Sequence, residues 1–181
     1  VFWRSTDGGE TWSDRMPRKD VVGREFATTQ LTSGAIVMTC HFLTQDSRNT
    51  DGYAYSKLFH SHDDGKTWKE TRVGPAGFPK KRPTNTNRNV FELPNPKDPQ
   101  KPIACLGIST SGYHDNKANY TSIWQSVDGA ETWDKSWKPD TQNWDDYDGF
   151  FGQSYTYRSP SGKMLHVVRV DRRGKYWKLE D

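Results

Sequence analysis

The chain has 181 residues, enough for one ordinary domain, and its 26 Lys and Arg against 23 Asp and Glu give a net charge of +3. This small, scattered basic excess argues against a nucleic-acid partner, and no apolar run approaches the roughly 20 residues that a membrane-spanning helix needs. Aromatic residues make up 13% of the chain, which argues against disorder and is typical of short strands that pack around flat rings.

Short apolar segments separated by turn residues follow one another along the chain, and none has helical periodicity. A strand is predicted over 1–4, before the first octapeptide, and the first round of strands follows over 25–31, 35–42 and 53–60. Similar rounds follow over 90–93, 103–109 and 120–125, and over 154–158, 163–170 and 175–179. The chain is therefore predicted to be all-β.

An octapeptide of the form S-x-D-x-G-x-T-W occurs at residues 5–12 and 61–68 and, altered, at 126–133. Its Asp is suited to accept backbone N–H groups across a turn, and its Gly to adopt a positive φ. In the third copy Ala130 stands in the place of this Gly, so we expect a turn of different shape. A structural role is assigned to Ser5, Asp7, Gly9, Thr11, Trp12, Ser61, Asp63, Gly65, Thr67, Trp68, Ser126, Asp128, Thr132 and Trp133.

The three copies open at Ser5, Ser61 and Ser126, at comparable intervals along the chain. Each interval is long enough for one four-stranded antiparallel sheet, the blade of a β-propeller. With the strands of a blade named A to D, the octapeptide is the C–D turn. The predicted units are a blade remnant (1–22), two blades (23–78 and 86–139) and a partial blade (150–181).

The first and third rounds align with each other without gaps, so that Gly34 matches Gly162 and His41 matches Arg169. About three blades cannot close a ring, which would leave blade faces exposed. We therefore expect the chain to be a fragment of a longer protein.

The octapeptide resembles the Asp box, or BNR repeat, of sialidases and related propellers, and the resemblance covers the whole chain through the repeat. It implies a sialidase-like β-propeller, six-bladed in the parent, and an exo-α-sialidase type of glycoside hydrolase that acts on terminal acidic sugars of a glycan or glycoconjugate. The same box occurs in receptors and other glycosidases, so a non-catalytic carbohydrate- or protein-binding propeller and a non-sialidase glycosidase stay open. The resemblance also favours an extracellular or periplasmic location.

In that family the boxes lie on the face away from the active site, which places the site among the D–A and B–C loops. Arg24 and Arg88 are each expected to begin a strand A, which lines the central channel. They are the candidates for a clamp on the substrate carboxylate, because Arg offers a planar bidentate fork. Gly152 takes the matching place in the third round, where Arg169 or Arg172 is the alternative.

Sialidases resemble one another in a Tyr nucleophile paired with a Glu, and in an Asp acid/base. Glu25 and Glu92, on strand A, are the candidates for this Glu. Tyr53, Tyr147 and Tyr155 are equal candidates for the nucleophile, and the Arg-Ile-Pro signature of the family is absent. Further candidates for substrate binding, each with an ordinary structural or solvated role as the alternative, are His41, Asp46, Arg48, Tyr53, His114, Asp115 and Arg169.

Cys40 and Cys105 lie in apolar runs and are predicted to be buried free thiols. The acidic segment 145–149 has the residue types that bind calcium but lacks EF-hand spacing, so it is predicted to be an ordinary acidic loop. No metal or cofactor is assigned.

Overall fold

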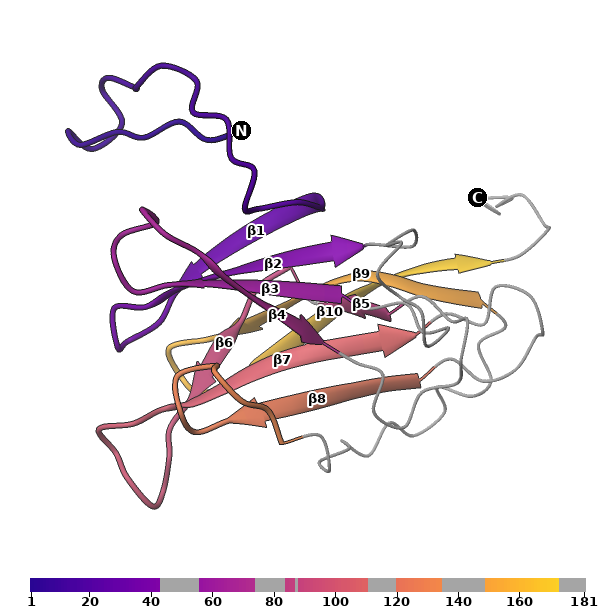
Figure 1. The fold of residues 1–181 in the computed structure, drawn as a ribbon. Coiled ribbons are helices and arrows are strands. Elements are labelled where there is room, and N and C mark those ends of the chain that lie inside the picture. Colours follow the sequence, from indigo (N-terminus) through magenta and orange to yellow (C-terminus); the bar gives the residue numbers. More distant parts are fainter. Residues whose placement is uncertain (43–55, 74–83, 87, 111–119, 135–148, 173–181) are drawn as a thin grey trace.

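The computed structural model of this protein describes residues 1–42, 56–73, 84–86, 88–110, 120–134 and 149–172. These residues form antiparallel strands and no helix, which confirms the all-β prediction (Figure 1). Within them, no helix is long and apolar enough to cross a membrane. The strands are β1 (Arg24–Gln30), β2 (Ile36–Phe42), β3 (Ser56–Ser61), β4 (Lys69–Val73), β5 (Thr84–Thr86), β6 (Phe91–Leu93), β7 (Ile103–Thr110), β8 (Tyr120–Ser126), β9 (Gly149–Arg158) and β10 (Met164–Arg172).

The first sheet is a four-stranded antiparallel meander in the order β1-β2-β3-β4. A tight turn joins β1 to β2, where the Gly34 N–H donates to the Leu31 carbonyl at 2.8 Å and Gly34 adopts a φ of 88°. The second octapeptide joins β3 to β4. The strand order predicted for this stretch of the sequence is therefore confirmed.

The second sheet departs from the prediction at its first strand, which is split into β5 and β6, both paired with β7. Thr86 of β5 pairs with Ile108, and Phe91 of β6 pairs with Cys105. Between these two pairs the split strand contains more residues than β7, and the extra residues interrupt its pairing. The expectation that Arg88 begins this strand is wrong, because β5 precedes it and Arg88 lies in the interruption. The pattern of apolar residues missed β5, whose Thr-Asn-Thr sequence is wholly polar.

The third sheet contains β9 and β10, and it repeats the pairing of the first sheet in the alignment predicted from the sequence as far as Val168, after which its register shifts. Its turn has the same hydrogen bonds, with the Gly162 N–H donating to the Ser159 carbonyl at 2.9 Å and Gly162 at a φ of 83°. Arg158 pairs with Met164, as Gln30 pairs with Ile36 in the first sheet.

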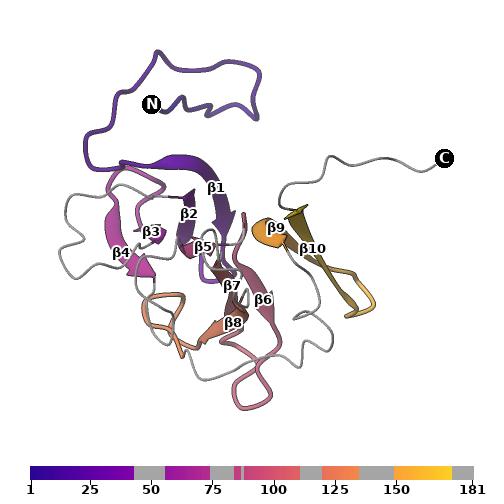
Figure 2. The ribbon, with the colours of Figure 1, turned by 90° about the vertical axis from the view of Figure 1, so that its right-hand side faces the viewer.

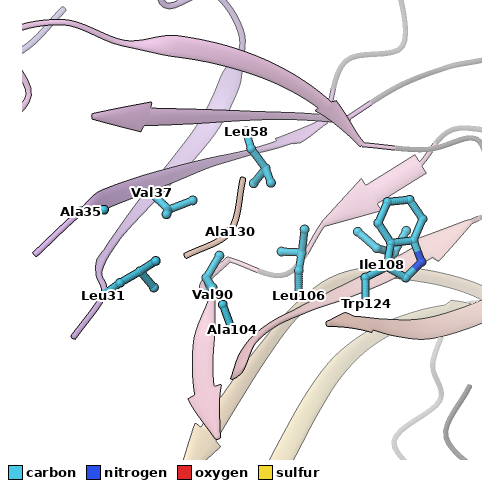
Figure 3. Packing of buried hydrophobic residues seen from close by; sticks show 10 residues of the cluster. All are labelled: Leu31, Ala35, Val37, Leu58, Val90, Ala104, Leu106, Ile108, Trp124 and Ala130. Carbon is cyan, nitrogen blue, oxygen red and sulfur yellow. The ribbon is translucent and has the colours of Figure 1, made fainter. Parts of the chain in front are cut away.

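The main core lies between the first and second sheets (Figure 3). Val37 and Leu58 of the first sheet and Leu106 of the second are fully buried in it. Its members are Leu31, Ala35, Val37, Leu58, Val90, Ala104, Leu106, Ile108, Trp124 and Ala130. The opposite face of the first sheet packs Met38, Cys40 and Phe59 against Val21 and the N-terminal segment. Burial on both faces explains why consecutive residues of β2 and β3, such as Val37 and Met38 or Leu58 and Phe59, are apolar and depart from a clean alternation.

The three sheets meet at β5, which contacts β2 and β9. In Figure 2 the first strands β1, β6 and β9 lie toward the middle of the molecule, and β4 and β10 lie toward its outside. Cys40 and Cys105 are buried free thiols, as predicted, and burial raises the pKa of Cys105 to about 12.

Candidate functional site

The strand alternation separates two ends of the molecule. The turns that follow β1 and β9 and the octapeptide turns lie together at one end, which we call the box end (left in Figure 1). The opposite end, the loop end, is where β2 finishes and β1 and β3 start. The site predicted from the sequence belongs to the loop end.

Arg24, Glu25 and His41 are placed at the loop end by their backbones. Arg24 is the first residue of β1 and pairs with Phe42, the last residue of β2. Arg169 lies toward the corresponding end of β10, within Met164–Arg172. These four candidates therefore lie on strands that start or finish at the same end of the molecule.

Arg88 is half-buried in the interruption between β5 and β6, and its carbonyl accepts a hydrogen bond from Thr39 Oγ1 at 3.0 Å. Thr39 pairs with Ala27, which follows Arg24 along β1. At about 3.4 Å per residue, the backbones of the two arginines differ by about 10 Å in level along the strands. The sheet contact thus brings Arg24 and Arg88 onto adjoining segments at staggered heights.

Glu92 lies apart from this group, because its carboxylate is at the box end. Its Oε2 atom accepts hydrogen bonds from the Thr32 N–H at 2.9 Å and from Thr32 Oγ1 at 2.7 Å. Thr32 belongs to the turn between β1 and β2, so the contact fastens the second sheet to the first.

The other predicted residues contribute less to the described structure. Tyr155 is exposed on β9, where it pairs with the exposed Val167 of β10. Outside the described residues lie Asp46, Arg48, Tyr53, His114, Asp115, Tyr147 and residues 145–148 of the acidic segment.

The three octapeptides form the same turn. In the second copy Asp63 Oδ1 accepts from the Thr67 N–H at 2.9 Å and from Ser61 Oγ at 2.8 Å, while the Gly65 N–H donates to Ser61 Oγ at 2.7 Å. The hydrogen bonds from Thr67 and then Ser61 hold the pKa of Asp63 well below its usual range. A carboxylate engaged in this way is suited to fixing the turn and is a poor proton donor.

The third octapeptide keeps this shape, so the expectation of an altered turn is wrong. Gly129 and Ala130 have φ values of 75° and 73°, matching 58° and 76° at Asp64 and Gly65. The Ala130 N–H still donates to the serine hydroxyl of its own turn, at 2.9 Å. Ala130 is fully buried in the main core. Burial of its methyl group offsets the cost, about 1–2 kcal/mol, of a left-handed conformation in a residue other than Gly.

The same conformation gives a graded prediction for the glycines of these turns. Gly129→Ala is expected to lower the free energy of unfolding by about 1–2 kcal/mol, because a Cβ there meets only backbone strain and no atom within 4 Å. Gly65→Ala is expected to cost more, since its Cβ would also lie 3.3 Å from the Trp68 ring. Urea denaturation measures both, and an equal or reversed order would contradict this account.

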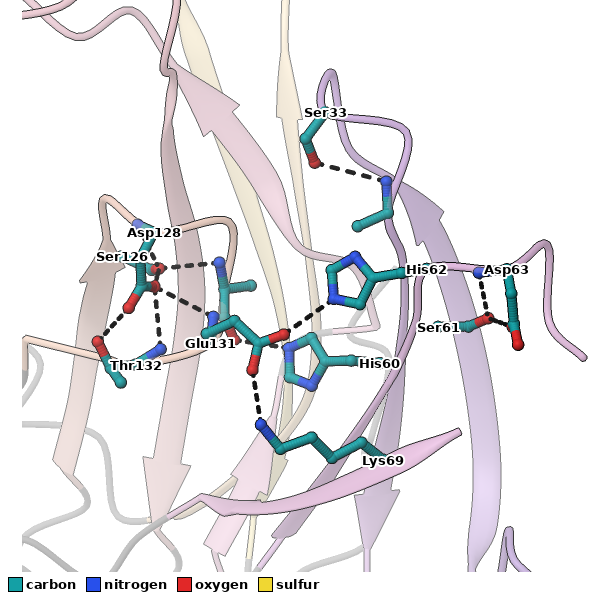
Figure 4. Close-up of polar contacts among 12 residues, drawn as sticks. Ser33, His60, Ser61, His62, Asp63, Lys69, Ser126, Asp128, Glu131 and Thr132 are labelled. Carbon is teal, nitrogen blue, oxygen red and sulfur yellow. Dashed lines mark hydrogen bonds and ion pairs between the residues drawn. The ribbon is translucent and has the colours of Figure 1, made fainter. Parts of the chain in front are cut away.

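A polar cluster at the box end joins the first and second sheets (Figure 4). The buried His60 donates from Nε2 to the Ala130 carbonyl at 2.6 Å. Glu131 accepts from His62 at 2.9 Å and from Lys69 at 3.0 Å. These two interactions, led by the one from His62, lower the pKa of Glu131, and burial lowers the pKa of His60.

Sequence reasoning missed this cluster because its partners are far apart in the chain and belong to different repeats. The available signal was positional: His60 directly precedes the serine of one octapeptide, as Arg4 precedes another. A cavity of about 480 Å³ adjoins the cluster. It is lined by Thr32, Ser33, His62, Glu92, Gln100, Lys101, Pro102, Val127, Asp128 and Gly129.

The two ends therefore offer different chemistry. At the box end the Asp carboxylates are occupied by turn hydrogen bonds, and in the described part of the chain no three His, Cys, Asp or Glu side chains are grouped as metal ligands. At the loop end, β1 of the first sheet carries Arg24 and β10 of the third sheet carries Arg169, and arginine is a residue type suited to bind an anion. A scan against models of known families finds no match for this chain, and a search of curated proteins finds no significant match either.

Proposed function

We propose that the chain forms part of a sialidase-like β-propeller that hydrolyses terminal acidic sugars at its loop end. Three features support the propeller: a four-stranded meander, octapeptide turns of one shape, and a third sheet that repeats the strand pairing and turn of the first. The same alignment matches Tyr157 and Leu165 of the third sheet to Thr29 and Val37 of the first sheet. Thr29 and Val37 lie on the face with which the first sheet contacts the second, whereas Tyr157 and Leu165 are exposed.

The observation that carries the enzymatic proposal is that Arg24 lies at the loop end and Arg88 lies on an adjoining segment, about 10 Å away in level along the strands. Their staggered backbones would allow two guanidinium groups to approach one anion from different levels. A charge-assisted, bidentate contact of this kind suits the carboxylate of an acidic sugar. Glu25, next to Arg24, is the remaining candidate for the Glu that activates a Tyr nucleophile, since Glu92 is engaged with Thr32 at the box end.

A non-catalytic sugar-binding propeller is the second candidate. It is favoured by the third sheet. There Gly152 takes the place that matches Arg24, and the preceding residue, Phe151, pairs with Val170, so this part of β9 supplies no arginine to the clamp. Binding of an acidic sugar requires only part of the clamp, whereas hydrolysis also requires the nucleophile and the acid.

The deciding experiment measures hydrolysis of a fluorogenic sialoside by the protein, expressed with any flanking blades, and by Arg24→Ala and Arg88→Ala. Each variant is expected to lose roughly 100-fold in kcat/KM, since a hydrogen bond to a charged group contributes about 1.5–3 kcal/mol. Arg158→Ala is the matched control, because this exposed arginine ends β9 at the box end.

Full activity in both Arg24→Ala and Arg88→Ala would refute the clamp. Absence of turnover, together with calorimetric binding of N-acetylneuraminic acid that depends on Arg24 and Arg88, would replace the hydrolase by the binding propeller. Absence of both turnover and binding would refute the two candidates together.

A further inference from the structure

The residue directly before the serine of each octapeptide differs among the three copies in whether its side chain can titrate. This residue is Arg4 in the first copy, His60 in the second and Gln125 in the third. Near neutral pH an Arg is always protonated, a Gln never is, and a His changes its charge within reach of ordinary conditions.

The first two residues of this series make similar contacts between neighbouring units, to carbonyls at adjacent positions of the turn. The Arg4 guanidinium donates to the carbonyl of Asp64, in the turn of the second octapeptide. His60 Nε2 donates to the carbonyl of Ala130, in the turn of the third octapeptide. Each contact thus joins the residue before one box to the turn of the next box. Of these two contacts, only the second is made by a residue type that can gain or lose its charge under ordinary conditions.

The surroundings of His60 accept its neutral form better than its protonated form. Its side chain is 1% exposed, and its second ring nitrogen, Nδ1, is buried with no hydrogen-bond partner among the described residues. Because Nε2 donates to a carbonyl, protonation would place a second N–H at Nδ1, where none of these residues offers an acceptor. An unsatisfied buried donor of this kind is costly.

The charged groups around His60 act in both directions: Glu131 favours the protonated ring, whereas His62 and Lys69 oppose it, and burial remains the largest influence. On β4 the residue paired with His60 is Lys69, and on its own turn the neighbour is His62; both are cationic when protonated. β2 presents the apolar Val37 opposite His60. The third octapeptide presents Glu131, whose carboxylate already binds both Lys69 and His62. A positive charge on His60 would therefore share the carboxylate of Glu131 with the Lys69 ammonium and with the His62 ring.

We propose that the His60–Ala130 contact is a proton-operated joint, which closes the first sheet on the second when His60 is neutral and loosens when His60 is protonated. The Arg4–Asp64 joint stays closed over the same range, since Arg does not titrate there. Burial lowers the pKa of His60, in agreement with this direction. The closed form then binds fewer protons than the open form, so its stability is present above about pH 6.5 and declines as the pH falls below that value.

The test is amide hydrogen exchange, read by NMR at single residues and corrected for the intrinsic exchange rate at each pH. The Ala130 amide, which donates to Ser126 Oγ, reports on the His60 joint. The Gly65 amide, which donates to Ser61 Oγ, reports on the Arg4 joint in the same molecule. Below about pH 6.5 the protection of Ala130 is expected to fall by up to about tenfold per pH unit, while that of Gly65 changes little.

His60→Gln places in the second copy the residue of the third copy, and it is expected to abolish the pH dependence at Ala130. His60→Arg, which places there the residue of the first copy, gives a second version of the test if the Gln variant does not fold. His166 is half-buried and also has a lowered pKa, which its partial burial causes, but it bonds to Thr156 of the third sheet and remains in both variants.

Equal pH responses at Ala130 and Gly65, or a response at Ala130 that persists in either variant, would overturn the proposal. If neither variant folds, the ring signals of His60 in the unmodified protein decide the question. Protonation of His60 without loss of protection at Ala130 would then overturn it.

Discussion

Trp124→Ala is expected to lower the free energy of unfolding by about 3–5 kcal/mol, the range for removing a buried aromatic side chain from a core. Trp124 lies on β8, is 1% exposed and packs in the main core with Ile108 of β7 (Figure 3). Its removal leaves a cavity between strands that are fixed by their own hydrogen bonds, so the surroundings cannot collapse fully into it. Urea denaturation followed by circular dichroism measures the loss.

Trp12→Ala is the matched control, because this Trp belongs to an octapeptide and is 63% exposed. It forfeits one hydrogen bond from Nε1 to the Gly9 carbonyl, at 3.0 Å. The expected cost is about 0.5–1.5 kcal/mol, the contribution of a typical hydrogen bond. If Trp124→Ala and Trp12→Ala lower the free energy of unfolding equally, the core between the sheets does not make the larger contribution to stability that is proposed for it.

Glu70→Ala is expected to destabilise the protein by about 3 kcal/mol, because it removes the carboxylate that bonds the buried Lys57 ammonium at 3.1 Å. The Lys57 side chain is 1% exposed, whereas that of Glu70 is 26% exposed. Breaking a buried ion pair costs about 3–5 kcal/mol, and partial hydration of Glu70 places this pair at the lower end. Thermal or urea unfolding near pH 7 measures the effect.

Replacement of the other partner, Lys57, is expected to destabilise the protein less. Lys57→Met keeps an unbranched side chain between β2 and β4 and removes the buried charge, while Glu70 keeps its access to water. Lys69→Met is the surface control, since Lys69 is 72% exposed in its pair with Glu131 and such pairs contribute about 0–1 kcal/mol. A loss in Lys57→Met that equals or exceeds that of Glu70→Ala would contradict the assignment of the cost to removal of the carboxylate that bonds the buried Lys57.

The sequence by itself determined those features whose physical causes are local. The octapeptide turn is one: Ser61, Asp63 and Thr67 satisfy one another and the turn backbone within a single short segment. The strand order of the first sheet and its repetition in the third were also predictable, because turn residues and apolar segments recur at fixed spacing. The two buried thiols followed from the apolar runs that contain them.

Other features were decided only by tertiary contacts. β5 has no apolar pattern and forms because β7 offers it a partner. Ala130 adopts the glycine conformation because the core buries its methyl group and His60, from a distant part of the chain, binds its carbonyl. The same reasoning explains Glu92, which the sequence placed with Glu25 on the same type of strand and which the structure places at the opposite end, bonded to Thr32.

The physical distinction is between interactions that close within one turn and interactions that join two sheets. A turn is specified by a few side chains acting on their own backbone, so its sequence can be read directly. A contact between sheets depends on register, on bulges and on which face each strand presents, and a shift of one residue reverses that face. The sequence therefore determined the repeating β architecture and its turns, and the tertiary structure decided which polar residues meet at each end of the sheets.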